Sequence, residues 1–266
     1  MPMRRLAAFT VGAIVCGVFS AAQPARAADL AAHRALYDLK LKGSHGGDVS
    51  AASGTMAYEV QDVCDGWATR QRLQMTITNH DGQDTQMLSD YTTWESKDGL
   101  KLRFRMRQTT DQSVTSDVAG DATLKATGAD GLATFTSPAA EKKPLPAGTL
   151  FPMKHTEALL AAAKEGKKFL ALPLFDGTTE TGPQDSSIVI GHWTSEPEGK
   201  WPDLKSLASG KFHIAFFDQG PGKQVPDYEV SMRYWDNGVA DDLDMDFGDF
   251  VMAGKLSDFK LLGKGC

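Results

Sequence analysis

The chain has 266 residues, of which 41% are hydrophobic and 23% charged, and its formal net charge is −6. This length allows one large domain or two small ones, and either can bury a substantial core. An acidic chain without a concentrated basic patch is a poor candidate for binding nucleic acid or anionic lipid surfaces.

The first 27 residues have the features of a bacterial secretory signal peptide. Arg4 and Arg5 precede an apolar run over residues 6–22, and Ala25-Arg26-Ala27 fits the small-x-small cleavage pattern. We therefore predict export to the periplasm, cleavage after Ala27 and a single mature domain over residues 28–266; an uncleaved anchor is the alternative. No later stretch approaches the roughly 20 apolar residues of a membrane helix, so no integral membrane segment is expected after cleavage.

Cleavage would remove three arginines and no acidic residue, which changes the net charge from −6 to −9. It would also leave two of the three cysteines, Cys64 and Cys266. Two cysteines in an exported protein suggest one disulfide, and two free or metal-binding thiols are the rival interpretation. The bond would bring the C-terminal strand back to the N-terminal strands, which predicts one closed unit. Chain entropy gives such a long loop about 5 kcal/mol of stabilisation as an upper figure.

In the first half, alternating apolar and polar residues predict a series of strands separated by short turns. Asp81-Gly82 and Asp98-Gly99 are two of these turns, and the repeated pattern is typical of an antiparallel meander. Residues 110–137 continue as shorter, more polar strands. Residues 138–148 are expected to form a crossing loop, because proline cannot donate to a strand ladder. The predicted strands cover residues 33–42, 53–60, 67–78, 83–96 and 100–109.

The second half begins with the one predicted helix. Pro152 precedes Met153–Lys164, which is rich in Ala, Leu, Lys and Glu, and Gly166 follows it as a stop signal. The segment from Tyr228 to Phe250 predicts a hairpin, because apolar and polar residues alternate on both sides of Asn237-Gly238, which favours a type I′ turn. Further strands are expected at residues 168–175, 187–193, 211–217 and 250–262.

About a dozen strands joined mostly by hairpin turns, with one helix, indicate a mainly β fold. We expect a large antiparallel sheet that coils into a spiral or incomplete barrel, because such closure removes exposed strand edges. The helix would cover one mouth. A two-sheet sandwich is the alternative.

Three features of the sequence are candidate sites. Asp242, Asp244 and Asp246 resemble the start of a calcium loop, but Phe247 stands where glycine is needed, so a solvated strand face is favoured. His155 at the head of the helix is interpreted as a packed or capping histidine, with a base or an anion ligand as the functional alternative. No catalytic motif, metal ligand set or cofactor motif is recognised, so neither catalytic nor metal-binding nor cofactor-binding residues are assigned.

The third feature is a basic stripe on the strand over residues 100–109. Lys101, Arg103, Arg105 and Arg107 alternate with apolar residues. They form either a solvated face paired with acids of a neighbouring strand or an inward basic lining that receives an acidic partner or ligand. We name these four residues as the candidate partner or ligand face.

An ordered set of short segments is distinctive in this chain: LAAHRALYDLKL at residues 30–41, Cys64-Asp65-Gly66, Gly148 to His155, Phe175-Asp176-Gly177, and Asn237 to Phe250 with the terminal Cys266. Together these segments resemble the family of envelope-integrity proteins called EipB in α-proteobacteria. The resemblance runs from about residue 29 to the end, with Phe175 where the family is expected to have tyrosine. It implies a periplasmic sheet coiled into a spiral with an associated helix, a Cys64–Cys266 disulfide, and maintenance of the envelope under stress without established catalytic residues.

The sequence leaves three candidate functions, which differ in the interior that they require. The first is a non-enzymatic periplasmic protein that supports envelope integrity by binding a protein partner, for example a helical-repeat protein. The second is a carrier of a lipid or other hydrophobic ligand, and the third is a hydrolase of envelope glycans that uses an unrecognised carboxylate pair. A filled interior would favour the first and an apolar cavity the second, whereas two carboxylates about 5–9 Å apart in a cleft would favour the third.

Overall fold

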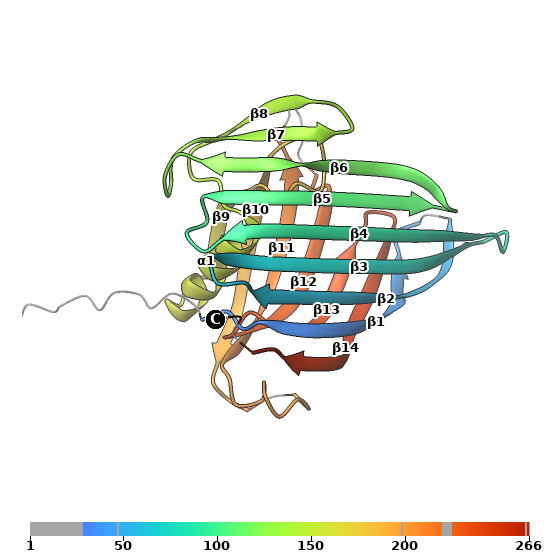
Figure 1. The fold of residues 1–266 in the computed structure, drawn as a ribbon. Helices are drawn as coiled ribbons and strands as arrows, with labels where there is room; N and C mark the ends of the chain where they lie inside the picture. The colour runs from blue at the N-terminus through green and yellow to red at the C-terminus, as the bar shows by residue number, and fades with distance from the viewer. Residues whose placement is uncertain (1–28, 47, 198, 220–224, 264, 266) are drawn as a thin grey trace, which may run out of the picture.

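A computed structural model describes residues 29–46, 48–197, 199–219, 225–263 and 265, so the predicted signal peptide and Cys266 lie outside the described residues. Within them, all strands form one antiparallel sheet, ordered β8-β7-β6-β5-β4-β3-β2-β1-β14-β13-β12-β11-β10-β9. The sheet curls without closing, and β8 and β9 are its two edges (Figure 1). The strands are β1 His33–Ser44, β2 Val49–Asp62, β3 Gly66–Asn79, β4 Asp84–Ser96, β5 Lys101–Thr110, β6 Ser113–Leu124, β7 Gly131–Ser137, β8 Glu141–Leu145, β9 Phe169–Leu174, β10 Gln184–Thr194, β11 Ser209–Asp218, β12 Tyr228–Trp235, β13 Ala240–Asp246 and β14 Phe250–Leu261.

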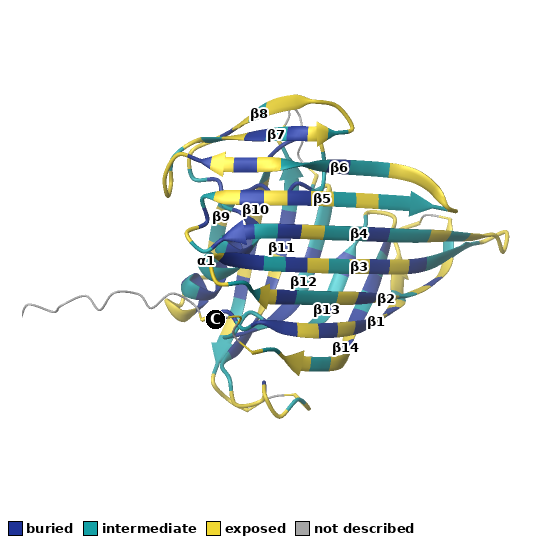
Figure 2. Ribbon diagram, in the orientation of Figure 1, coloured by how far each residue is buried: buried dark blue, intermediate teal, exposed yellow. Residues whose placement is uncertain are grey.

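Alternation along the strands separates an inner face from an outer face. In β1, His33, Ala35, Tyr37 and Leu39 are buried, and the residues between them are exposed. The same alternation marks most strands in Figure 2. Because successive side chains of a strand point to opposite faces, one face of the whole sheet is committed to the interior.

The first and last strands lie side by side. β1 pairs with β14 from His33–Leu261 to Ser44–Phe250, and with β2 on its other side. This pairing joins the meander β1–β8 to the meander β9–β14. The prediction that the C-terminal strand returns to the N-terminal strands is confirmed, and the two-sheet sandwich is wrong.

The single described helix, α1, spans Pro152–Lys164 as predicted and lies at one end of the curled sheet (Figure 1). Proline occupies its start, where a missing N–H costs nothing. Gly166 follows its end with φ 75°, the left-handed conformation that stops a helix. Leu159 and Leu160 are fully buried, so the helix packs against the sheet rather than standing in solvent. Among the described residues, no helix is both long enough and apolar enough to span a bilayer.

Two expectations about strands are corrected. The loop expected over residues 138–148 contains the strand β8, which pairs with β7 from Gly131–Leu145 to Phe135–Glu141. Pro144 is compatible with this strand because β8 is an edge, where a missing donor faces outward. The strand after β5 is also longer than expected, since β6 runs over 12 residues.

The turn between β12 and β13 also differs from the type I′ geometry expected at Asn237-Gly238. Within the described part of this turn only Gly238 has a positive φ, 82°. The Gly238 N–H donates to the Trp235 carbonyl, and the Trp235 N–H donates to the Val239 carbonyl. A type I turn followed by a left-handed glycine, with a bulge, therefore closes the hairpin.

The interior contains two clusters of buried side chains. The larger one is spread over strands from both meanders and the buried side of α1. The smaller one, called here the phenylalanine cluster, lies between β5, β6 and β7 and the segments that enter and leave α1 and β9. Its aromatic members are Phe104, Phe135, Phe151 and Phe175.

A candidate ligand-binding cavity

A cavity of about 680 Å³ lies inside the curled sheet. Its volume is within the usual range of pockets for small ligands. All five tyrosines of the chain line it, together with six methionines. The tyrosines are Tyr37, Tyr58, Tyr91, Tyr228 and Tyr234, and the methionines are Met56, Met87, Met106, Met153, Met232 and Met245.

The tyrosines are fixed in the wall with their phenols neutral. The Tyr37 hydroxyl donates to the Ala240 carbonyl at 2.8 Å, and the Tyr91 hydroxyl donates to the Asp176 carbonyl at 2.6 Å. Burial raises the pKa of both phenols above the ordinary value. Methionine side chains are flexible and fill irregular space, so the wall combines fixed rings with side chains that can adapt to a ligand.

Polar side chains interrupt this apolar wall in two places. Gln71, Ser89 and Gln108 line the cavity from β3, β4 and β5, and Asp176, Gln184, Asp218 and Asp227 line it from the second meander. Ser89 lies directly opposite Gln108 in the β4–β5 pair, so these two are neighbours on one face. A mainly apolar pocket with a few polar groups orients a ligand that has one polar end.

The segment that follows β9 forms the wall between the cavity and the phenylalanine cluster. The Phe175 ring contacts Phe104, Phe135 and Phe151, with centroids 5.3, 6.1 and 6.4 Å away. On the other side of the same segment, Asp176, Thr178 and Thr179 line the cavity. A Cβ on Gly177 would lie 2.3 Å from the Phe104 ring, so glycine allows this close approach.

Glu95 of β4 fixes the start of α1 beside the cavity. Its carboxylate accepts hydrogen bonds from the backbone N–H groups of Met153 at 2.7 Å and Lys154 at 3.0 Å. Phe151, the residue before the helix, supplies no capping side chain, so an acid from the sheet takes that role. Burial raises the pKa of Glu95 to about 7, although the two amides favour its charged form.

His155 is a packed histidine, as the sequence favoured. Its Nε2 lies 2.8 Å from the Ser186 hydroxyl, and that hydroxyl donates to the Leu172 carbonyl at 2.7 Å. The serine proton is therefore committed to the backbone, and His155 donates to the serine rather than activating it. Burial lowers the pKa of His155 to about 4, which keeps the ring neutral.

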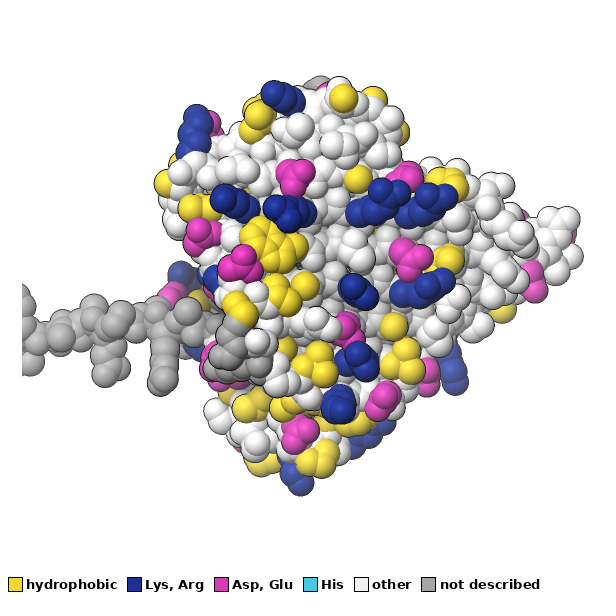
Figure 3. Space-filling model, in the orientation of Figure 1, with side chains coloured by type: hydrophobic (Ala, Val, Ile, Leu, Met, Phe, Trp, Pro, Cys, Tyr) yellow, Lys and Arg dark blue, Asp and Glu magenta, His cyan; other side chains and the backbone are white. Residues whose placement is uncertain are grey.

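The basic stripe lies on the outer face of the sheet. Arg105 and Arg107 pair with Asp117 of β6 at 3.0 and 3.3 Å, and Arg103 lies 3.5 Å from Asp121. Figure 3 shows Lys and Arg side chains gathered along β5 on this face. The alternative of an inward basic lining is wrong, because Leu102, Phe104 and Met106, which alternate with the stripe, are the side chains that turn inward.

The three aspartates that resemble the start of a calcium loop lie on β13. Asp244 and Asp246 of β13 pair with Lys42 and His45 at 2.7 and 3.1 Å. No group of three metal-ligating side chains occurs among the described residues, and these acids form a solvated strand face.

The Cys64 sulfur lies 3.8 Å from the Gly265 carbonyl, which places the chain end beside the turn before β3. The Cys64–Cys266 bond stays a prediction, because Cys266 is outside the described residues.

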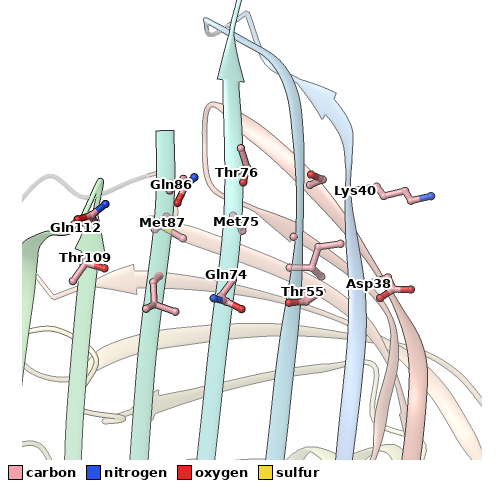
Figure 4. Close-up of a pocket in the computed structure, with 14 residues that line it drawn as sticks. Asp38, Lys40, Thr55, Gln74, Met75, Thr76, Gln86, Met87, Thr109 and Gln112 are labelled. Carbon is pink, nitrogen blue, oxygen red and sulfur yellow. The ribbon is translucent and has the colours of Figure 1, made fainter. Parts of the chain in front are cut away.

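A second hollow, of about 620 Å³, crosses β1–β5 and is shown in Figure 4. Its labelled side chains are mostly polar and uncharged, and Thr55, Gln74 and Gln86 are exposed whereas Met75 is buried. None of these three polar side chains makes a side-chain hydrogen bond within the described residues. We interpret it as a solvated trough on the outer face, separated from the cavity by the sheet, with Met87 in the lining of both.

Sequence reasoning did not find Glu95, and it offered an apolar cavity only as the condition for the alternative carrier function. The lack of a capping residue before Pro152 was the available signal that an acceptor must come from elsewhere. Glu95 shares the inward parity of Tyr91 and Ser89 along β4, which is unusual for an acid. The cavity tyrosines have no spacing motif, since they are separated by up to 197 positions along the chain.

Fold and cavity together define a class of barrel-like β proteins in which an open, curled sheet surrounds an apolar interior. Residues 24–263 match the family model described as EipB-like. The chain is 32% identical to the cell envelope integrity protein EipB of Brucella abortus, over 98% of this chain and 96% of that protein. It also resembles the crystal structure of a β-barrel-like protein with a domain of unknown function from Brucella abortus, with 28% identity and a TM-score of 0.80, over 89% of this chain and all of that one. The chain belongs to the EipB-like family.

Proposed function

We propose that this protein supports the integrity of the cell envelope from the periplasm as a non-enzymatic carrier of a lipid or another hydrophobic ligand. The single observation that carries the proposal is the cavity lined by tyrosines and methionines inside the sheet. The envelope role follows the name of the Brucella abortus relative, cell envelope integrity protein EipB. The periplasmic location follows the predicted signal peptide over residues 1–27.

The cavity changes the order of the candidate functions. The sequence favours a protein-binding scaffold, on the condition that the interior is filled. The space of about 680 Å³ supports a carrier instead. A ligand with an apolar body and one polar end suits the walls, because Ser89 and Gln108 form a polar pair among apolar side chains. An acyl chain with its polar head has this chemistry.

Protein binding is the second candidate function. Lys101 of the basic stripe has no ion pair within the described residues, and Arg103 stacks over the Trp94 ring at 5.3 Å. An acidic surface of a periplasmic partner, such as a helical-repeat protein, would meet this exposed face. The pairs made by Arg105 and Arg107 with Asp117 weaken the candidate, because a partner must compete with them.

A hydrolase is the least supported candidate. Glu95 is engaged by two helix amides, and the Ser186 hydroxyl is engaged by the Leu172 carbonyl. Among the aspartates that line the cavity, Asp176 accepts from the N–H and the hydroxyl of Thr178, and Asp218 accepts from the Gln184 amide, so these carboxylates also have structural partners.

The carrier proposal is tested by native mass spectrometry of the protein taken gently from its own periplasm. We expect a discrete added mass that is lost on organic extraction. The variant Met87→Trp narrows the cavity from β4 and should lose this mass. Leu88→Trp is the matched control, because the next residue points to the outer face and should keep it. A bare wild-type mass, or equal loading of both variants, would contradict the carrier.

A further inference from the structure

We propose that the β9 edge of the sheet, at Phe169 and Ala171, binds an extended segment of a partner protein as an added strand, and that this segment carries acidic residues next to its apolar ones. This inference does not depend on the cavity and goes beyond the carrier function. It comes from a difference between the two edges of the sheet.

Two residues of β9 turn their backbone groups away from the sheet. The Ile190 N–H donates to the Lys168 carbonyl at 2.8 Å, so Lys168 faces β10. In an antiparallel pair, every second residue turns both backbone groups to its partner. Leu170 and Leu172 therefore also face β10, whereas Phe169 and Ala171 present their N–H and C=O groups to the open side. A strand edge with free groups of this kind is a template for an incoming strand.

The rest of the β9 edge is already covered. Leu150 forms a parallel bridge beside Leu174, where its N–H donates to the Pro173 carbonyl at 2.9 Å and its carbonyl accepts from Phe175 at 3.0 Å. No such cover reaches Phe169 or Ala171 among the described residues. The segment at Leu150 thus shows how an added strand would pair with β9, but it does not extend to Phe169 or Ala171.

The side chains at this edge are apolar and exposed. Phe169 is 75% exposed, the largest value among the large hydrophobic side chains that are exposed in the described residues. It lies directly opposite Val189 of β10, which is 44% exposed, so the two form one apolar area on the outer face. An incoming strand would place an apolar side chain against this area while its backbone pairs with the edge.

The opposite edge is protected against such binding. β8 carries Lys142, Lys143 and Pro144, and charged residues with proline are the usual protection of an exposed edge. Lys143 also donates to the Glu180 carbonyl. The β9 edge has no proline or charge between Phe169 and Leu172, so of these two edges it is the one left ready for pairing.

Local charge selects the partner. Lys164 pairs with Asp236 and Lys167 pairs with Glu165 at 2.8 Å, whereas Lys168, which directly precedes Phe169, has no acidic partner among the described residues. This positive charge at the open positions, on a chain of negative net charge, favours an acidic residue beside the apolar part of the added strand. A second copy of this chain would instead bring its own Lys168 against this one, so a partner segment is favoured over self-pairing.

The test uses the full mature chain and a set of short fluorescent peptides that alternate valine and threonine and end in acidic, neutral or basic residues. We expect the acidic peptide to bind tightest, with an affinity that falls as salt rises. On binding, amide hydrogen exchange at Phe169 and Ala171 should slow. Ala171→Pro removes an outward N–H and should weaken binding about tenfold, which is the loss of one well-made contact.

Two further variants make the test decisive. Phe169→Thr keeps strand propensity but removes the exposed ring, and it should also weaken binding even if Ala171→Pro folds poorly. Leu132→Thr is the matched control, because Leu132 is 42% exposed on β7, a strand with neighbours on both sides, and it should leave binding unchanged. Absence of saturable binding by every peptide, or binding that Ala171→Pro and Phe169→Thr leave unchanged, would overturn the proposal. Concentration-dependent dimers that Ala171→Pro abolishes would assign the edge to a second copy and overturn it as well.

Discussion

The interior of this protein is filled beside β5–β7 and hollow between the two meanders. In the filled region, Phe104 packs edge-on against Phe135 and Phe175. Glycines make this possible, since a Cβ on Gly120 or Gly177 would lie within 2.8 Å of the Phe104 ring. In the hollow region the side chains are equally large, yet the facing walls leave about 680 Å³ between them.

The difference shows that a cavity does not require small residues. Tyr58 and Tyr91 come from the first meander, and Tyr228 and Tyr234 come from the second. Tyr228 and Tyr234 pack against Phe216 and Phe212 of their own meander, and Tyr91 is bonded to the Asp176 carbonyl of the segment between β9 and β10. The same segment places the Phe175 ring among three other phenylalanines, so it contacts both the hollow and the filled region.

The largest expected effect separates the two regions by stability. Phe175→Ala should lower the free energy of unfolding by about 3–5 kcal/mol, because it opens a void in a filled cluster. Met232→Ala, on the cavity wall, should cost about 2 kcal/mol, near the lower end for such a truncation, since part of its surface already faces empty space. Urea unfolding of both variants measures the comparison, and equal losses would mean that the cavity is filled in the native protein.

The next effect concerns the predicted bond between the chain end and the turn before β3. Cys64→Ser and Cys266→Ser should lower the free energy of unfolding by the same amount, about 2–5 kcal/mol, because either change removes the same link. Thermal melts of the two single variants and of the double variant test this. Clearly unequal shifts, or two alkylated thiols in the oxidised mature protein, would speak against the pairing.

Sequence patterns predict the strands of both regions but not the difference between them. Alternation alone places Tyr37, Tyr228 and Tyr234 on the same side of their strands as the other apolar residues, because period two fixes the face of a strand residue. It does not tell whether inward rings meet, since this depends on the distance between walls made by residues about 200 positions apart. The β8 strand was missed because Pro144 excludes a central strand but not an edge strand.

The candidate site was even less accessible to sequence reasoning. Glu95 accepts from Met153 of α1, which lies 58 positions later in the chain, and that partnership appears in no local pattern. The basic stripe is the opposite case, because the sequence predicts its alternation along one strand and leaves open only whether it lies on the inner or the outer face of the sheet. The stripe is exposed on the outer surface because Leu102 and Phe104, which alternate with it, are buried, and Asp117 and Asp121 pair with its arginines there.

A smaller effect is expected from Glu95, which joins the helix to the hollow region. Its pKa is about 7 in the folded protein against an ordinary value of 4.5, so the folded state binds the proton more tightly. Glu95 therefore adds stability that is fully present below pH 4.5 and is lost as the pH rises through 7, with about 3 kcal/mol as the upper limit. Over part of this range His155 has the opposite effect on stability. Its pKa is lowered in the folded protein, so the unfolded state binds the proton more tightly and the folded protein becomes less stable as the pH falls.

The variant Glu95→Gln isolates the contribution of Glu95 from that of His155. It cannot titrate, so the difference in unfolding free energy between wild type and variant should change with pH between 7 and 4.5, in favour of wild type at the acid end. Denaturant unfolding across this range supplies the measurement. A constant difference would show that the acid is already protonated, or that its charge is solvated, in the folded protein.

The smallest effect is expected on the outer wall of the filled region. Arg105→Ala removes an exposed pair with Asp117 and should change the free energy of unfolding by less than about 1 kcal/mol. The arginine is 54% exposed and Arg107 still reaches the same carboxylate, so little of the pairing is lost. If the basic stripe binds an acidic partner, the same variant should weaken that complex, and more so at low salt, while leaving the thermal melt almost unchanged. A variant that destabilised the fold as strongly as Phe175→Ala would instead make the stripe part of the packed structure, and its value as a free binding face would be gone.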